Sequence, residues 1–130
     1  MVQRGLDSLG PKQLAVLGVL WDLGQASVHE VRDRLDRRKP PAYTTVLSTL
    51  QKLERLGWVR HEARGRTYIY RATSSRSAAR LGSLRALIAR FFRGDPLLLM
   101  ENLLDEEPLG PKDLERLRRM IDARRKGAGP

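Results

Sequence analysis

The spacing of apolar residues in this chain changes at Gly57. Before that residue, apolar side chains recur every three or four positions, as in helices that pack one face on a core. After it, runs rich in aromatic and β-branched residues, 58–63 and 67–71, show a period of two, which predicts antiparallel strands. The segment between them, 64–66, has a central glycine, which is typical of a tight hairpin loop.

Three helical segments precede the predicted hairpin. The first, around 14–21, follows Gly10-Pro11 and ends at Gly24, which are residue types common at helix ends. The second begins at Ser27 in a capping-box sequence and is expected to reach about Asp36. Two prolines then interrupt the helical pattern, and a third helix follows. This order, complete by about residue 72, matches a winged helix-turn-helix, which is mostly α with a small β-hairpin.

The third helical segment, AYTTVLSTLQKLERLGW, has two distinct faces. Its apolar side chains share one arc of a helical wheel, which predicts contact with the core: Tyr43, Val46, Leu47, Leu50 and Leu53. The opposite face carries short hydroxyls followed by amide and basic groups: Thr44, Thr45, Ser48, Gln51, Lys52 and Arg55. Threonine has a low helix propensity, so a property other than propensity is expected to favour it here.

The charge of the chain favours a polyanionic partner. Its 25 lysines and arginines outnumber its 15 acidic residues, for a net charge of +10. Basic residues precede the third helix and flank the hairpin glycine, on elements that a winged helix turns toward double-stranded DNA. The expected DNA contacts are Arg37, Arg38, Lys39, Tyr43, Thr44, Thr45, Ser48, Lys52, Arg55, Arg64 and Arg66. The hydroxyls are expected near phosphates and base edges, and Lys52 and Arg55 at phosphates.

Each of these features also has a simpler interpretation. A solvated polar face is the rule on a surface helix, and a single basic cluster is usually a solubilising surface. A winged helix can also present its polar face to an acidic protein. The alternative function is therefore a protein–protein interaction module with no specific DNA site.

Catalytic, cofactor and membrane motifs are absent from the sequence. It has no Gly-rich phosphate loop, nucleophile motif or recognisable carboxylate pair, which argues against an enzyme. Two histidines without any cysteine do not suggest a metal site, and no cofactor is predicted. No apolar run approaches a membrane span and the N-terminal segment lacks a secretory pattern, so we expect a cytoplasmic protein without a membrane partner.

Three further helices are predicted after residues 73–75. A long apolar face covers 75–92, the following segment is apolar on most sides, and Gly110-Pro111 opens the last helix. These helices carry more apolar face than they can bury among themselves, so we expect a second copy of the chain to cover it. The expected dimer contacts are Leu81, Leu84, Ile88, Phe91, Leu98, Leu103, Leu114, Leu117 and Ile121.

The chain is thus expected to contain a winged-helix DNA-binding domain over 1–72 and a three-helix dimerisation domain over 73–126. A flexible tail is expected over 127–130, with fraying from Arg124 onward. A symmetric dimer implies a target DNA that is roughly palindromic.

Four stretches of the sequence resemble the penicillinase-repressor family of winged-helix regulators, which includes methicillin-resistance and copper-responsive repressors. The stretches are LGPKQLAVLGVLWDLGQASVHEV, AYTTVLSTLQKLERLGWV, GRTYIY and NLLDEEPLGPKDLERLRRMI. The resemblance implies a homodimeric repressor that occupies a promoter operator and blocks transcription until it is induced.

The resemblance also concerns induction. In β-lactam-responsive members, a sensor-linked protease cuts the dimerisation segment between an asparagine and a phenylalanine, and the matching pair here is Asn102-Leu103. Leucine in place of phenylalanine is a departure from that pattern. The copper-responsive members sense metal through C-terminal cysteines, and this chain has no cysteine, which excludes cysteine-based copper sensing.

Overall fold

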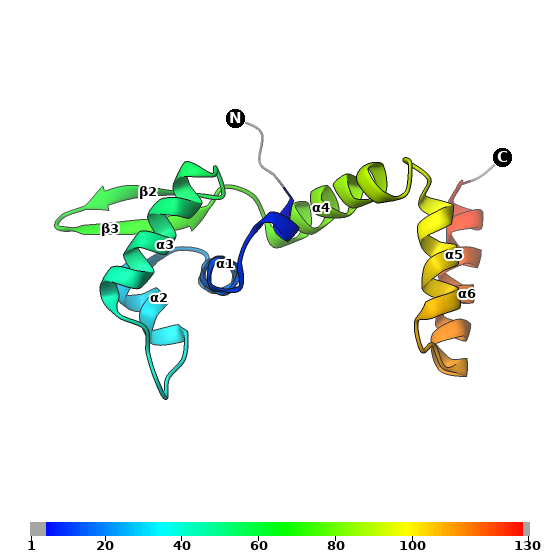
Figure 1. Ribbon diagram of the computed structural model, residues 1–130, viewed down its shortest axis with the longest axis horizontal. Coiled ribbons are helices and arrows are strands. Elements are labelled where there is room, and N and C mark those ends of the chain that lie inside the picture. Colours follow the sequence, from blue (N-terminus) through cyan, green and yellow to red (C-terminus); the bar gives the residue numbers. More distant parts are fainter. Residues whose placement is uncertain (1–4, 129–130) are drawn as a thin grey trace. The chain divides into compact units, whose positions relative to one another are not determined.

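A computed structural model describes residues 5–128 of the chain (Figure 1). The chain divides into two compact units, 1–87 and 88–130. The first unit contains η1 (Leu6–Ser8), α1 (Pro11–Leu23), β1 (Ala26–Ser27), α2 (Val28–Arg34), α3 (Tyr43–Arg55), β2 (Val59–Arg64) and β3 (Thr67–Ala72). Helix α4 (Arg76–Phe91) spans the division, and α5 (Pro96–Glu106) and α6 (Pro111–Ala128) belong to the second unit. This order confirms the predicted winged helix, which is mostly α with a hairpin.

Helices α1 and α2 begin where the sequence predicted. The Gly10 N–H donates to Gln13 Oε1 at 2.9 Å, and Gly24, at φ 85°, ends α1. The Glu30 N–H donates to Ser27 Oγ at 3.2 Å and the Ser27 N–H donates to Glu30 Oε1 at 3.0 Å, which forms the predicted capping box. Helix α2 ends at Arg34, before the expected limit at Asp36.

The sheet has three strands in the order β1-β3-β2, all antiparallel neighbours. The sequence predicted only β2 and β3; β1 has two residues, too few to show a period of two, and Ala26 pairs with Tyr70. Tyr68 and Tyr70 share one face of β3, yet Tyr70 is buried and Tyr68 is exposed. The difference arises because the hairpin tip extends beyond α3 (Figure 1).

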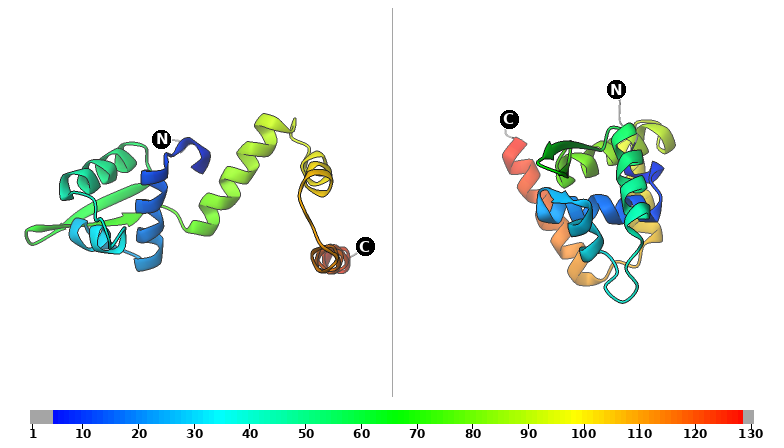
Figure 2. Two further views of the ribbon diagram at one scale, coloured as in Figure 1. Left: turned by 60° about the horizontal axis from the view of Figure 1, so that its bottom comes forward. Right: turned by 90° about the vertical axis from the view of Figure 1, so that its left-hand side faces the viewer.

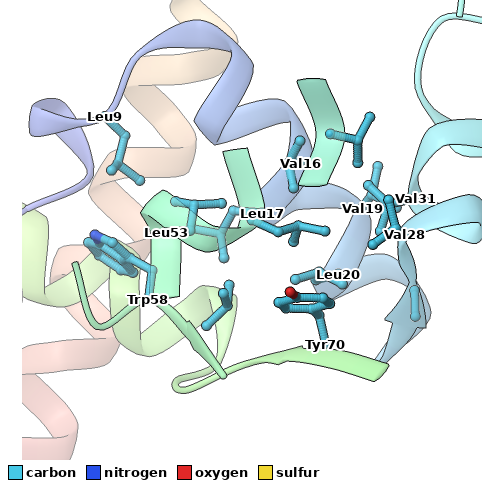
Figure 3. Packing of buried hydrophobic residues seen from close by; sticks show 14 of the residues in the cluster. Leu9, Val16, Leu17, Val19, Leu20, Val28, Val31, Leu53, Trp58 and Tyr70 are labelled. Carbon is cyan, nitrogen blue, oxygen red and sulfur yellow. The ribbon is translucent and has the colours of Figure 1, made fainter. Parts of the chain in front are cut away.

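The core of the first unit gathers apolar side chains from α1, α2, α3 and the hairpin (Figure 3). Its largest fully buried members are Tyr70, Leu17, Leu20, Leu50, Leu53, Val31, Val46 and Val59. Burying each leucine or valine contributes about 1.5–3 kcal/mol relative to exposure. The apolar arc predicted for the third helix therefore holds for Val46, Leu50 and Leu53, which fix the rotation of α3 about its axis.

Two residues of the predicted apolar arc, Tyr43 and Leu47, lie nearer the surface than expected. Tyr43 is 41% exposed and its ring packs against His29, with ring centroids 4.7 Å apart. Leu47 is only partly buried. Of the two tryptophans, Trp21 is partly buried and its Nε1–H donates to the Ser74 carbonyl at 2.9 Å, whereas Trp58 is 3% exposed.

The start of α4 is attached to the winged helix. Ala79 is buried in its core, and the Arg76 guanidinium donates to Asp22 Oδ1 at 2.7 Å and to the Gly18 carbonyl at 3.2 Å. The Leu6 N–H also donates to Ser83 Oγ at 2.7 Å. These contacts explain why the first compact unit continues to Leu87, past the boundary expected after residue 72.

The side chains of 88–127 in the second unit form no buried core. Among residues 88–127, whose burial the structure describes, no side chain is buried, including those of α5, whose sequence is apolar on most sides. Helix α6 continues to Ala128, where fraying was expected from Arg124, and 129–130 lie outside the described residues. Within residues 5–128, none of the helices combines the length and the hydropathy needed to cross a bilayer.

Candidate nucleic-acid interface

The polar face of α3 points away from the core. Val46, Leu50 and Leu53 fix the buried side, and at about 100° per residue the opposite side carries Thr44 and Ser48. The exposed residues of this outward face are Thr44, Ser48, Gln51, Lys52 and Arg55. Thr45 is half-buried and lies toward one edge of the same face.

The hydroxyls of α3 are partly engaged within the helix. Ser48 Oγ donates to the Thr45 carbonyl at 3.0 Å, and Thr49 Oγ1 donates to the same carbonyl at 2.8 Å. Both hydroxyl protons are therefore used, and the oxygen lone pairs are the groups that remain for a partner. In this rotamer Ser48 can accept a hydrogen bond, for example from an exocyclic amino group of a base.

A groove of about 760 Å³ borders one edge of the outward face. Its walls are the start of α1 with the preceding turn and the polar side of α3: Ser8, Gly10, Pro11, Lys12, Gln13, Ser48, Thr49, Lys52 and Arg55. Lys12, Lys52 and Arg55 bring three cations to this groove beside a helix N-terminus, an arrangement that suits a phosphate. Lys12 was not predicted, because only the fold brings it close to residues far away in the sequence.

The hairpin borders the other edge of the outward face. His61 Nδ1 on β2 lies 2.6 Å from Glu54 Oε1 on α3, and the His61 ring packs against Tyr68 and Tyr70. Glu54 is six residues after Ser48, which places it about 120° around the helix, on the side away from Thr45 and Thr49. The outward face is therefore flanked by the groove on one side and by the hairpin on the other.

Arg64 and Arg66 occupy different environments at the hairpin tip. Arg64 ends β2, and its guanidinium donates to Glu62 Oε1 at 2.7 and 3.1 Å and to Gln25 Oε1 at 3.3 Å. These hydrogen bonds hold the Arg64 side chain against Glu62 and Gln25. The hydrogen bond and charge of Arg64 hold the pKa of Glu62 below its usual value, with smaller contributions from Arg71 and Arg60. Arg66 lies exposed in the turn and makes no ion pair within residues 5–128.

Two further arginines of the hairpin, which were not predicted as DNA contacts, lie opposite each other. Arg60 and Arg71 are direct cross-strand partners and both are exposed. Like charges in this position destabilise a sheet, and a bound anion relieves their repulsion. The two-residue loop between β2 and β3 implies this register, so the pair could have been inferred from the sequence.

The loop before α3 presents its basic residues to solvent. Arg37, Arg38 and Lys39 are exposed, and the backbone N–H groups of Arg38 and Lys39 donate to Asp36 Oδ1 at 2.9 and 3.2 Å. Arg32 Nε donates to the Pro41 carbonyl at 2.7 Å, which ties the end of the loop to α2. The loop extends outward from α2 and α3 in Figure 1 and in the right-hand view of Figure 2.

The residues expected to form a dimer are mostly exposed. The exposed ones are Leu81, Leu84, Phe91, Leu98, Leu103, Leu114 and Ile121. The other two, Ile88 and Leu117, are half-buried. Asn102, of the expected cleavage pair, lies within α5, and its Nδ2 donates to the Leu98 carbonyl at 2.8 Å.

Comparison with solved structures finds several transcriptional regulators. A MarR/EmrR family regulator from Acinetobacter sp. ADP1 is 20% identical, with a TM-score of 0.45, and the match covers 92% of this chain and 76% of that one. The PcaV regulator from Streptomyces coelicolor, solved with its natural ligand, is 22% identical, with a TM-score of 0.44, and the match covers 92% and 77%. No curated protein matches the chain.

A family model described as "Penicillinase repressor" matches residues 9–123, nearly the whole chain. The match includes α1 to α5 and most of α6, so it extends over both compact units. The family consists of DNA-binding transcriptional regulators and not of enzymes, which confirms the function class predicted from the sequence. The chain belongs to the penicillinase repressor family.

Proposed function

We propose that this repressor binds DNA as a homodimer, with α3 of each copy in the major groove of one half of a pseudo-palindromic operator. The observation that carries this proposal is the position of the cations around one face of α3. Lys12, Lys52 and Arg55 line the groove at one edge, and the hairpin with Arg66 borders the other. Phosphates on either side of a major groove would meet these cations while the face between them meets base edges.

The residues of the interface divide into two roles. Thr44, Thr45 and Ser48 read base edges, with Tyr43 beside them at the start of α3. The remaining members bind phosphates: Lys12, Arg37, Arg38, Lys39, Lys52, Arg55 and Arg66, whereas Arg64 is held by Glu62 and Gln25. Each good base contact contributes about 1–3 kcal/mol of discrimination, so a single α3 specifies a half-site only weakly.

A second copy of the chain would cover the exposed apolar side chains of the C-terminal helices. No side chain among residues 88–127 is buried, yet α4, α5 and α6 present a series of exposed leucines with Phe91 and Ile121. Apolar surface on this scale is costly in water, and self-association removes it. Joining two DNA-binding domains makes the second half-site contact intramolecular, which raises the affinity for the operator about 10²–10⁴-fold.

Derepression follows from any signal that weakens this dimer. Cleavage between Asn102 and Leu103 would divide α5 and separate α6 from the rest of the chain. Because Asn102 is hydrogen-bonded within an intact helix, a protease gains access only when α5 opens locally. In the native host, an Asn102→Ala protein is expected to remain bound to its operator under inducing conditions, and normal derepression of this variant would exclude cleavage at this site.

Footprinting and gel-shift titration against fragments of the native genome test the proposed function. We expect protection of two half-sites related by a two-fold axis. Lys52→Ala should weaken binding and reduce the salt dependence by about one unit of log–log slope, whereas Arg116→Ala, an exposed change on α6, should do neither. Weak retention that is equal for all fragments would instead support the protein-interaction module.

A further inference from the structure

A pocket of about 290 Å³ lies between α1, the loop before α3 and α3 itself. Its walls are formed by Lys12, Ala15, Val16, Leu35, Asp36, Lys39, Pro41, Thr45, Val46 and Thr49. Val16 and Val46 belong to the hydrophobic core and are 3% and 1% exposed, so the inner wall is apolar and firmly packed. Small-molecule sites are concave and mostly apolar, with few polar groups, and have volumes from about 300 Å³ upward.

The polar groups of this pocket select the charge of a ligand. Asp36 Oδ1 already accepts from the backbone N–H groups of Arg38 and Lys39, and Thr49 Oγ1 donates to the Thr45 carbonyl. Lys12 and Lys39 are exposed and form no ion pair within residues 5–128. Two lysines against one aspartate leave one positive charge at the rim of an apolar pocket, which complements a monoanion with an apolar body.

We propose that this pocket binds a small apolar monocarboxylate and that the bound ligand weakens DNA binding. At the volume of roughly 30 Å³ that a water molecule occupies in the liquid, the pocket accommodates about ten non-hydrogen atoms, the size of a benzoate ion. The apolar body contacts Val16, Leu35 and Val46, and the carboxylate lies near the lysine ammonium groups.

The coupling to DNA rests on the proposed function, because Lys12, Lys39 and Thr45 are shared between the pocket and the DNA interface. A carboxylate beside the lysines neutralises cations that would otherwise bind phosphates, so ligand and DNA lower each other's affinity by the same factor. Binding of the ligand itself does not depend on DNA and is measured separately.

Benzoate titrated into the full chain, followed by amide chemical shifts, tests the site. We expect saturable shifts centred on Val16 and Val46, and at least tenfold weaker binding of benzamide, which has the same shape without the charge. Ala15→Phe fills the pocket and should abolish binding, while Ala78→Phe, at an exposed alanine of α4, should not. The change Lys39→Gln, at an exposed residue, should weaken benzoate binding without disturbing the fold.

Several outcomes of this titration would overturn the proposal. Absence of saturable benzoate binding would remove the site, and equal binding of benzamide would remove the charge selection. Binding that persists in Ala15→Phe would place the ligand elsewhere. If Ala15→Phe does not fold, undiminished benzoate binding to Lys39→Gln would overturn the proposed role of the lysine rim.

A gel shift with benzoate, against sodium chloride at matched ionic strength, tests the coupling. Operator retention should fall over the same benzoate range as the direct titration, and Ala15→Phe should bind DNA normally without responding. Benzoate binding that leaves operator retention unchanged would overturn the coupling. A protein that retains no specific DNA even without benzoate would contradict the proposed function, while the direct titration would still decide whether the pocket binds the ligand.

Discussion

Single side chains at the hairpin tip set the positive charge at that edge of the proposed DNA interface. Arg64 is held by Glu62, whereas Arg66, two residues away, is not in an ion pair within the described part of the chain. The carboxylate of Glu62 therefore reduces the positive charge at the tip, and its lowered pKa keeps it ionised below the usual range of a glutamate.

Glu62→Gln should release Arg64 and strengthen binding to DNA. The change removes a negative charge and frees a guanidinium for a phosphate, so affinity should rise several-fold at low salt, and the salt dependence should steepen by about one unit of log–log slope. Fluorescence anisotropy over a salt series measures both. Glu115→Gln, which removes a similar exposed partner of Arg118 on α6, is the control. Identical slopes for wild type and Glu62→Gln would show that Arg64 does not reach DNA.

Ionisation of the buried Tyr70 side chain should make the stability of the protein depend on pH in the alkaline range. Burial raises the pKa of its phenol above the usual 10.0, and the charge of Glu54 adds to this effect. The stability that the neutral Tyr70 phenol contributes is fully present below about pH 10. It is lost as the pH rises through the raised pKa, because Tyr70 ionises at a lower pH in the unfolded chain than in the folded protein. Urea unfolding of Tyr70→Phe should therefore show a smaller loss of stability above pH 10 than wild type, and parallel losses would contradict this assignment.

At the scale of elements, the hydrogen bonds at the start of α2 fix the helix that supports α3. Ser27 and Glu30 satisfy each other's backbone N–H groups, and the loss of such a cap costs about 1 kcal/mol. Ser27→Ala should lower the melting temperature by roughly 4 °C and leave DNA affinity unchanged where both proteins are folded. Ser77→Ala, at an exposed serine of α4, should show no comparable loss in a calorimetric scan. A DNA defect without a stability defect would point to a direct role of Ser27.

The outward face of α3 should control which sequence is preferred. Thr44→Ala and Ser48→Ala remove groups proposed to read base edges, so the preference among operator variants should change by about 1–3 kcal/mol at one position per half-site. Lys52→Ala, on the same helix, should weaken binding uniformly. Competition among operators with single base changes measures the difference. Equal losses on operator and random DNA for the hydroxyl variants would exclude base reading by Thr44 and Ser48.

At the scale of the whole molecule, the proposed function makes DNA affinity depend on whether two copies associate. Leu114 on α6 is 46% exposed, and a carboxylate there would be buried in the proposed dimer. Leu114→Asp should give a monomer in sedimentation equilibrium and lower operator affinity about 100-fold or more. Ala123→Asp adds the same charge on the opposite side of α6 and should preserve the dimer. A dimer that survives Leu114→Asp would place the interface on another surface.

The sequence by itself determined the order of the helices and the hairpin, the capping of α2, the outward position of Thr44 and Ser48 on α3, and the family. These features depend on local periodicity and helix-end chemistry, which a few neighbouring residues encode. Only the tertiary structure decided that Lys12 joins Lys52 at one groove, that Arg64 is restrained by Glu62 and Gln25, and that the first compact unit includes the start of α4. These features require contacts between distant segments or a particular side-chain conformation, and residue spacing specifies neither.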